Sequence, residues 1–355
     1  MIDILILIAG LALILFGANY LVDGASAIAK RFGISDFIIG MTIVGIGTST
    51  PEMVVSFLSA AQGNADIAVG NVIGSNLFNI FMILGVTALI LPLSLTKNNI
   101  KKDIPFALLA ALVLTFAGSD ILLDNATANI ISRTDGLMLL SLFAVFMAYT
   151  IYSSQSAGAE LQQSAGAELQ QSTGNEQKQN ATNEISQTII TSQNDSATGQ
   201  SAKPKPIWLS LLMVIGGLAG LVYGGDLFVA SASAIAKMLG VSDAVIAVTI
   251  MAGGTSLPEL ASCVVAAYKK NTDLALGNVI GSNVANIFMI LGGSAVIHPL
   301  GMNNIGQMDL GFLLLSSILL FITAFTFKKR SLDRIEGVLF ILIYIGYIIL
   351  TIQRG

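Results

Sequence analysis

The alternation of long apolar stretches with short polar ones predicts a bundle of membrane-spanning helices. A spanning helix needs about 20 mostly apolar residues, and ten stretches of this kind occur along the 355 residues. We place them at about 2–23, 36–62, 67–92, 104–123, 136–153, 206–230, 243–268, 274–298, 309–327 and 335–353. The first is interpreted as a retained span, because it has no basic N-terminal region and no clear small-residue cleavage site.

One polar segment separates the first five spans from the last five. Residues 154–203 are rich in Ser, Gln, Ala, Gly and Asn, and they contain the octamer SAGAELQQ twice in tandem. Such a segment has too little apolar surface to offset the entropy lost on ordering, so we predict a flexible linker. The predicted organisation is an N-terminal five-helix repeat over 1–153, a disordered linker over 154–205 and a C-terminal five-helix repeat over 206–355.

The two groups of spans are related in sequence. The heptapeptide GNVIGSN occurs at 70–76 and again at 277–283, an offset of 207 positions. At that offset, residues 40–85 match residues 247–292 at 25 of 46 positions without a gap. The chain is therefore predicted to be two homologous halves.

The basic residues predict how these halves are oriented. Of the 17 Lys and Arg residues, 14 lie in segments on the side opposite the N-terminus. Cytoplasmic loops carry such an excess, so we expect the linker in the cytoplasm and both termini outside the inner or plasma membrane. Because five is an odd number of spans, the second half must run upside down relative to the first. Inverted repeats are a recurring transporter architecture, although channels can also be built this way.

Composition excludes several classes of protein. Hydrophobic residues make up 54% of the chain and charged residues 11%, whereas a soluble domain carries about 25% charged residues. The net charge of −4 gives no reason to expect a nucleic-acid partner. A single cysteine, Cys263, rules out a disulfide framework within one chain. We see no His, Lys or Cys constellation of the kind an enzyme would need, and expect no catalytic residues and no cofactor. The oligomeric state is left open.

Two acidic residues stand near the centres of predicted spans. Glu52 ends the motif GTSTPE and Glu259 ends GTSLPE, at equivalent positions of the two halves. A charge at this depth costs about 2.5–3.5 kcal/mol on insertion scales, and no Lys or Arg lies at comparable depth. Protonation, a water-filled cavity or a bound cation would each make the two carboxylates tolerable.

Oxygen atoms surround both acids in the sequence. Thr48 and Thr255 each lie four residues before the acid, about one helical turn away and therefore on the same face. Each motif also has a proline, which cannot donate a backbone hydrogen bond and releases the carbonyl four residues earlier. These pairs are Pro51 with Gly47 and Pro258 with Gly254. Carboxylate, hydroxyl and carbonyl oxygens suit hard cations such as Ca2+ or Na+.

The repeated heptapeptide adds a polar stripe to each half. Asn71, Ser75 and Asn79 fall at i, i+4 and i+8 on one helix face, and the second half repeats the pattern with Asn278, Ser282 and Asn286. The glycines beside them have the small-xxx-small spacing that allows helices to approach closely. We interpret the stripes as further oxygen ligands of one site, with each half supplying one wall.

GTSTPE with GNVIGSNLFN, and GTSLPE with GNVIGSNVAN, resemble the two alpha repeats of the calcium/cation antiporter superfamily, and most of all its prokaryotic sodium/calcium exchanger branch. The resemblance implies an all-α membrane protein of ten transmembrane helices in two inverted repeats. It implies exchange of Ca2+ for Na+ by alternating access, with the first and sixth helices sliding past the rest. The implied calcium ligands are Glu52, Glu259, Thr48 and Thr255. The implied sodium ligands are Ser49, Ser75, Ser256 and Ser282, with carbonyls near Gly45 and Ala252, while Asn79 and Asn286 match the polar positions between them.

Two departures from related patterns bear on the counter-ion. Some members of the superfamily have an aspartate at the position of Asn286, which is associated with an extra protonatable group or with potassium dependence. The proton-coupled branch has an acid in the third-span motif, as in GNAAE, where this chain reads GNVIG. Both departures favour Na+, while an H+/Ca2+ antiporter, a K+-dependent antiporter and a cation channel remain alternatives. The expected partners are Ca2+, Na+ and the lipid bilayer.

Overall fold

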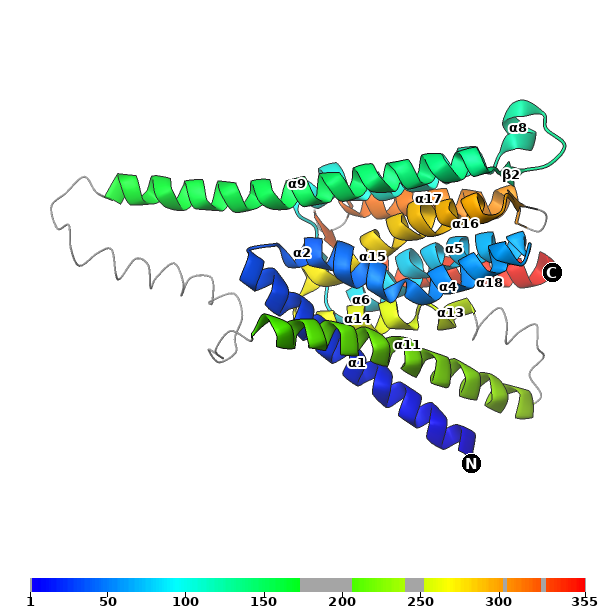
Figure 1. Cartoon of the computed structure of the whole chain (residues 1–355), viewed down its shortest axis with the longest axis horizontal. Helices are drawn as coiled ribbons and strands as arrows, with labels where there is room; N and C mark the ends of the chain where they lie inside the picture. The colour runs from blue at the N-terminus through cyan, green and yellow to red at the C-terminus, as the bar shows by residue number, and fades with distance from the viewer. Residues whose placement is uncertain (1, 173–205, 240–251, 303–304, 327–329, 355) are drawn as a thin grey trace.

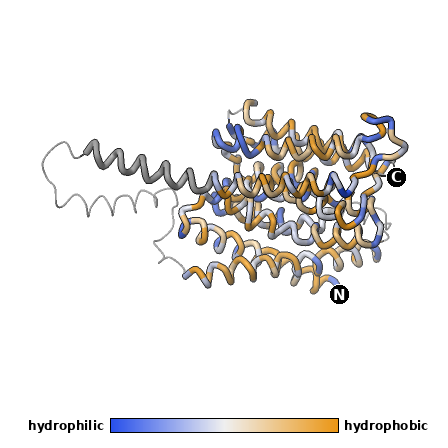
Figure 2. Tube along the Cα trace, turned by 45° about the horizontal axis from the view of Figure 1, so that its top comes forward, coloured by the Kyte–Doolittle hydropathy of each residue, from blue (hydrophilic) through white to orange (hydrophobic). Residues whose placement is uncertain are grey.

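The computed structural model describes residues 2–172, 206–239, 252–302, 305–326 and 330–354, with the side chains of 153–172 left out. Over this part of the chain the protein is a bundle of long apolar helices tied by two small strand pairs (Figure 1). Six helices are long and apolar enough to cross a membrane, and a seventh span is formed if the bent pair Asp36–Thr48 and Thr50–Ala61 counts as one. Figure 2 shows apolar residues along most of their length.

The first half contains most of the predicted spans as continuous or broken helices. Its elements are α1 (Ile2–Phe32), α2 (Asp36–Ile39), η1 (Gly40–Val44), α3 (Gly45–Thr48), α4 (Thr50–Ala61), α5 (Ala65–Leu77), η2 (Phe78–Ile83), α6 (Leu84–Ile90), β1 (Leu93–Ser94), η3 (Asn99–Asp103), α7 (Ile104–Ala117), α8 (Asp120–Asp124), β2 (Ile130–Ile131) and α9 (Arg133–Ser172). The η elements are π-helical turns inside longer helices, which is where such turns usually occur.

The second half repeats this order. Its elements are α11 (Ile207–Met238), α13 (Ala252–Gly254), α14 (Leu257–Tyr268), α15 (Thr272–Val284), η5 (Ala285–Leu291), α16 (Gly292–Ile297), β3 (Leu300–Gly301), α17 (Gln307–Thr323), β4 (Ser331–Leu332) and α18 (Arg334–Arg354). Part of the predicted span 243–268 falls at 240–251, outside the described residues. The ten-span count and the inversion of the halves therefore stay predictions.

Several predicted boundaries differ from the structure, since α1 continues to Phe32 and α11 to Met238, beyond the predicted ends at about 23 and 230. The span predicted at 104–123 is broken, because helix α7 ends at Ala117 with Gly118 as its C-cap and the short α8 follows. Helix α9 continues from the predicted span 136–153 to Ser172, into the segment where we predicted a flexible chain. The SAGAELQQ repeats consist largely of Ala, Leu, Glu and Gln, which are strong helix formers and extend a helix already started. Residues 173–205 of the predicted linker lie outside the described residues.

Helices α1 and α11, the corresponding first helices of the two halves, lie side by side along one edge of the bundle (Figure 1). Their close contacts pair Gly10 with Gly224, Gly17 with Gly217 and Gly24 with Ser210. The residue numbers in α1 rise along these contacts while those in α11 fall, so the two helices run antiparallel. A Cβ atom added at Gly17 would lie 2.8 Å from the carbonyl oxygen of Gly217. Small residues seven positions apart thus allow the two backbones to touch.

This contact predicts a difference between two neighbouring glycines. A Cβ at Gly217 would lie 2.6 Å from the backbone nitrogen of Leu21, whereas a Cβ at Gly216 has nothing within 4 Å. We expect Gly217→Val to destabilise the protein by about 1–3 kcal/mol through overpacking and Gly216→Val to leave stability nearly unchanged. Thermal unfolding in detergent measures both. Equal melting temperatures for the two variants would contradict the close α1–α11 contact.

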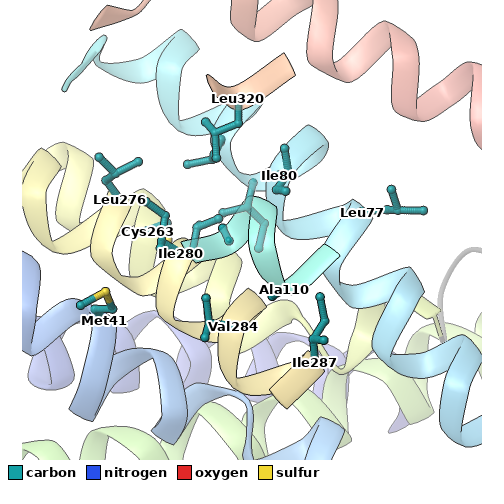
Figure 3. Packing of buried hydrophobic residues seen from close by; sticks show 14 of the residues in the cluster. Met41, Leu77, Ile80, Ala110, Cys263, Leu276, Ile280, Val284, Ile287 and Leu320 are labelled. Atoms are coloured by element: carbon teal, nitrogen blue, oxygen red, sulfur yellow. The ribbon is translucent and has the colours of Figure 1, made fainter. Parts of the chain in front are cut away.

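Short strand pairs connect the two halves at their ends. Strand β1 pairs antiparallel with β4, and β2 with β3, so each half contributes one strand to each pair. Between the ends, apolar side chains from both halves form one buried core; Leu77 and Ile80 of the first half and Ile280, Val284 and Ile287 of the second belong to it (Figure 3). The core lies around the helices that carry the polar motifs and fixes their positions.

Candidate functional site

The two acidic motifs sit at breaks in their helices. Ser49 separates α3 from α4, and the two segments meet at 46°. Ser256 has a similar backbone conformation between α13 and α14. Each break is followed by a proline in the first turn, where its missing N–H costs nothing. Glu52 and Glu259 therefore lie in the first turns of α4 and α14, at helix ends whose dipoles favour negative charge.

Both carboxylates are fully buried and are bound by residues of the opposite half. The Ser256 hydroxyl donates to Oε1 of Glu52 at 2.9 Å, and the Ser49 hydroxyl donates to Oε1 of Glu259 at 3.0 Å. Ser75 adds a third hydroxyl, at 3.3 Å from Oε1 of Glu52. The two serine bonds join equivalent positions and each crosses from one half to the other, so the site belongs to neither half alone.

Several oxygen atoms in this region are buried without a hydrogen-bond partner in the described residues. The second carboxylate oxygens of Glu52 and Glu259 are among them, as is the hydroxyl of Thr255. Thr255 lies beside Glu52, and Thr48 beside Glu259. The side-chain oxygens Oδ1 of Asn79 and Asn286 complete the set. Leaving a buried polar atom unsatisfied costs about 1–3 kcal/mol. Oxygen atoms without donors fit a hard cation, which would supply what the protein leaves unmatched.

Two further predicted ligands, Thr48 and Ser282, have hydroxyl groups that already donate hydrogen bonds within the protein. The Thr48 hydroxyl has two acceptors within reach and can donate to one of them at a time, Oδ1 of Asn278 at 3.2 Å or the carbonyl oxygen of Gly45 at 3.4 Å. Ser282 donates to the same Gly45 carbonyl at 3.0 Å. These hydroxyl oxygens keep lone pairs for a cation. Helix α13 begins at Ala252, but its side chain is outside the described residues.

The carbonyl released by Pro51 has a different fate from the one we predicted. The oxygen of Gly47 accepts the hydroxyl of Thr50 at 2.7 Å, so a side chain replaces the lost backbone donor. In the second half, Leu257 stands at the position of Thr50 and has no hydroxyl for the carbonyl of Gly254. Pro258 starts α14 as Pro51 starts α4.

The first asparagine of each polar stripe, Asn71 or Asn278, holds two helices together. The amide of Asn71 donates to the backbone carbonyl of Glu52 at 3.1 Å and to Ser56 at 2.9 Å. The amide of Asn278 donates to Ser262 at 2.7 Å. The amide nitrogens of these two asparagines therefore tie α5 to α4 and α15 to α14.

Sequence reasoning missed Asn76 and Asn283, the last residues of the repeated heptapeptide. Both are buried, and they connect the two halves through the amides of Asn79 and Asn286. Their presence in both copies of GNVIGSN was the available signal. Neither residue belongs to the i, i+4, i+8 stripe of its own helix. Each contacts the stripe of the other half only because the two helices cross in the folded protein.

A cavity of about 760 Å3 reaches this region between α4, α11 and α14. Its lining includes Thr50 and Pro51, next to Glu52, and Thr255 and Pro258, next to Glu259. Along α11 it extends from Val222 to Lys237 and includes Asp226, Ala230 and Ser233. The cavity thus reaches chain neighbours of both acids, while the acids themselves stay buried.

Comparison with known proteins gives consistent matches over nearly the whole chain. The family profile described as sodium/calcium exchanger protein matches residues 2–152 and 209–353. The putative antiporter CaxA of Alkalimonas amylolytica is 33% identical over 96% of this chain and 95% of its own length. The sodium/calcium exchanger MaX1 of Methanosarcina acetivorans is 34% identical over 98% of both. A solved structure of the sodium-calcium exchanger NCX_Mj, soaked with Na+ and Ca2+, superposes with a TM-score of 0.75 at 32% identity and covers 98% of both chains.

Proposed function

Because the chain belongs to the sodium/calcium exchanger family, in the prokaryotic branch of the calcium/cation antiporter superfamily, we propose that it exchanges Ca2+ for Na+ by alternating access. The family consists of multi-pass membrane transporters rather than enzymes. The curated MaX1 and the solved NCX_Mj are both named sodium/calcium exchangers, which supports Ca2+ and Na+ as the substrates.

The observation that carries this proposal is the pair of buried glutamates. Glu52 and Glu259 come from opposite halves and are bound by crossed serines. Each leaves one carboxylate oxygen without a hydrogen-bond partner among the residues that the structure describes. Two carboxylates neutralise one Ca2+, and the surrounding neutral oxygens complete the coordination of a hard cation. The same oxygens can hold Na+ ions, so competition for one set of ligands would couple the two fluxes. Asn286, neutral where some relatives have an acid, favours Na+ over H+ or K+ as the counter-ion.

We also propose the membrane orientation predicted from the basic residues. Both termini lie at the same end of the molecule, whereas α9 projects from the opposite end (Figure 1). That arrangement supports an even number of spans, and the antiparallel pairing of α1 and α11 supports inversion of the halves. We therefore place ten spans in the inner or plasma membrane with the termini outside.

Alternating access is supported by a difference between the two ends of the molecule. At one end, Asp226, Ala230 and Ser233 of α11 line the cavity, and the hydroxyl of Ser233 has no hydrogen-bond partner in the described residues. The equivalent residues of α1, at the offset of 207, are Asn19, Asp23 and Ser26. All three are engaged by the segment that follows α14.

That engagement closes the equivalent end. Lys269 forms an ion pair with Asp23 at 2.7 Å and donates to the backbone carbonyl of Asn19 at 3.1 Å. Asn271 donates to Ser26 at 3.0 Å and to Asp36 at 2.9 Å. At the open end, the residues equivalent to Lys269 and Asn271 are Gln62 and Asn64, which bond to each other. The structure thus has the form expected of an outward-facing state in which the two acids stay buried and the cytoplasmic end is closed.

This difference predicts that the ion pair biases the transporter toward one state. Asp23→Ala and Lys269→Gln give the closed end the residues of the open end. Each should favour the inward-open state by up to about fivefold, because an exposed ion pair contributes about 0.2–1 kcal/mol. The measurement is thiol labelling of Ala261→Cys from the cytoplasmic side in a Cys263→Ser background. Labelling should become faster in both variants, and unchanged in the control Lys101→Ala. Equal labelling rates in all four proteins would show that the ion pair between Lys269 and Asp23 does not keep the cytoplasmic end closed.

The decisive test of the function is calcium uptake by proteoliposomes containing the purified protein. An outward Na+ gradient should drive uptake, while K+ or H+ gradients of equal size should not. Uptake driven by H+ or K+ would select one of the alternative antiporters. Calcium conductance without any counter-ion gradient would instead indicate a channel.

A further inference from the structure

The helices carrying the two GNVIGSN motifs cross where asparagines of the two halves meet. The amide nitrogen of Asn79, in η2, lies 2.9 Å from Oδ1 of Asn283, in α15. Both side chains are buried, so water does not compete for this bond. The contact joins residues 204 positions apart and is part of the packing between the halves.

The orientation of the Asn283 amide is fixed by the backbone. Its nitrogen donates to the carbonyl oxygen of Asn76 at 3.4 Å. A carbonyl oxygen can only accept, so the NH2 group of Asn283 must face it, and the side-chain oxygen of Asn283 must face Asn79. Asn79 in turn has to present its NH2 group to Asn283. Its own oxygen, Oδ1, then remains buried without a partner in the described residues.

We place that oxygen in the ion site from its position on the helix. Asn79 follows Ser75 by four residues on the same helix face, and Ser75 donates to Oε1 of Glu52. If the Asn79 amide were reversed, its NH2 group would replace the oxygen on this face, and a donor nitrogen repels a cation. Whether Asn79 turns its oxygen or its NH2 group toward the cation thus depends on whether Asn283 turns its oxygen or its NH2 group toward Asn79.

The second half lacks this anchor. The amide of Asn286 donates to Oδ1 of Asn76 at 3.4 Å, but the nitrogen of Asn76 has no partner in the described residues. Nothing comparable to the backbone bond of Asn283 fixes the orientation of Asn76. The two positions are equivalent in sequence and differ in how firmly the structure holds them.

We propose that Asn283 is a positioning residue that turns the Asn79 amide so that its oxygen faces the cation. This inference rests on the proposed function, because it assumes that Ca2+ or Na+ is bound at Glu52 and Glu259. Asn283 would act through Asn79 without touching the ion. Groups that orient metal ligands typically change metal affinity by about 10–100-fold when they are removed.

The test is direct Ca2+ binding to the purified protein in detergent, measured by calorimetry. We expect Asn283→Leu to weaken Ca2+ binding about tenfold and Asn76→Leu to weaken it less. Asn283→Ala, which removes the same amide, should behave like Asn283→Leu and serves if the leucine variant does not fold. In an Asn79→Ala background, Asn283→Leu should have almost no further effect on affinity, because the group it orients is gone.

The outcomes separate a positioning role from a structural one. If Asn283 only braces the helices, its replacement will lower the melting temperature equally in both backgrounds and leave Ca2+ affinity unchanged in correctly folded protein. An equal loss of affinity with and without Asn79 would also overturn the inference. Calcium binding by the wild-type protein with no Na+-driven uptake would overturn the proposed exchange alone. Absence of Ca2+ binding by the wild-type protein would overturn both.

Discussion

Replacing either Glu52 or Glu259 by glutamine is expected to abolish calcium exchange while the protein still inserts and folds. Glutamine keeps the volume of the side chain and an oxygen that can accept the crossed serine bond, but it removes one of two buried negative charges. Removing one partner of a buried pair of opposite charges costs about 3–5 kcal/mol. Applied to the attraction between one carboxylate and a bound divalent cation, this cost corresponds to a loss of about a hundredfold or more in affinity for the ion. The two variants should be equivalent because the site is shared between the halves.

The measurement is Na+-driven Ca2+ uptake per folded molecule, with Glu336→Gln as the matched control. Glu336 is also a buried carboxylate, but it accepts the backbone N–H of Asp333 at 2.7 Å at the start of α18, away from the acidic motifs. That variant should keep exchange even if its stability falls. Wild-type exchange rates in properly inserted Glu52→Gln and Glu259→Gln proteins would refute the cation site.

Gly281→Ala is expected to destroy the packing of the bundle around the site. A Cβ atom at Gly281, in α15, would lie 2.0 Å from the carbonyl oxygen of Met41, in η1, and 2.6 Å from the carbonyl carbon and Cα of Met41. Real Cβ atoms do not approach backbone atoms so closely, and backbone on both sides leaves nothing to rotate away. Close-packed interiors transmit such a displacement, so the neighbouring Ser282–Gly45 bond would break as well.

Size-exclusion chromatography and thermal unfolding test this, with Gly311→Ala as the control. Gly311 lies in α17 with nothing within 4 Å of an added Cβ, and alanine is the better helix former there. We expect that variant to be at least as stable as the wild type, and Gly281→Ala to yield little monodisperse protein. A normally folded Gly281→Ala protein that exchanges calcium would show that the α15–η1 contact is looser than the structure has it.

The family and the chemistry of the site could be predicted because their signals are local. Hydropathy alone identifies a membrane protein, and self-comparison finds the repeat. A carboxylate near the centre of an apolar span indicates function because its desolvation would otherwise be too costly. The comparisons confirm the family predicted from GTSTPE, GTSLPE and the two GNVIGSN motifs. None of this requires knowing which helix touches which.

The partners of individual side chains could not be predicted from the same signals. Helical periodicity places Asn71 on the face of Ser75, but only packing against α4 turns its amide to the Glu52 backbone. Periodicity also does not predict that the hydroxyl of Thr50 donates to the carbonyl oxygen of Gly47, which Pro51 leaves without a backbone donor. The Asn71 bond depends on how two helices pack, and the Thr50 bond depends on the local conformation at the helix break.

The sequence by itself therefore determined the membrane environment, the two related halves and the oxygen-rich motifs around Glu52 and Glu259. The tertiary structure decided that each glutamate is bound by the serine of the opposite half, that α1 and α11 touch through glycines, and that one end is open while the equivalent end is closed by Lys269 and Asp23. The physical reason is distance along the chain. Composition and periodicity describe each helix alone, whereas these contacts join residues about 200 or more positions apart and exist only once the helices have packed.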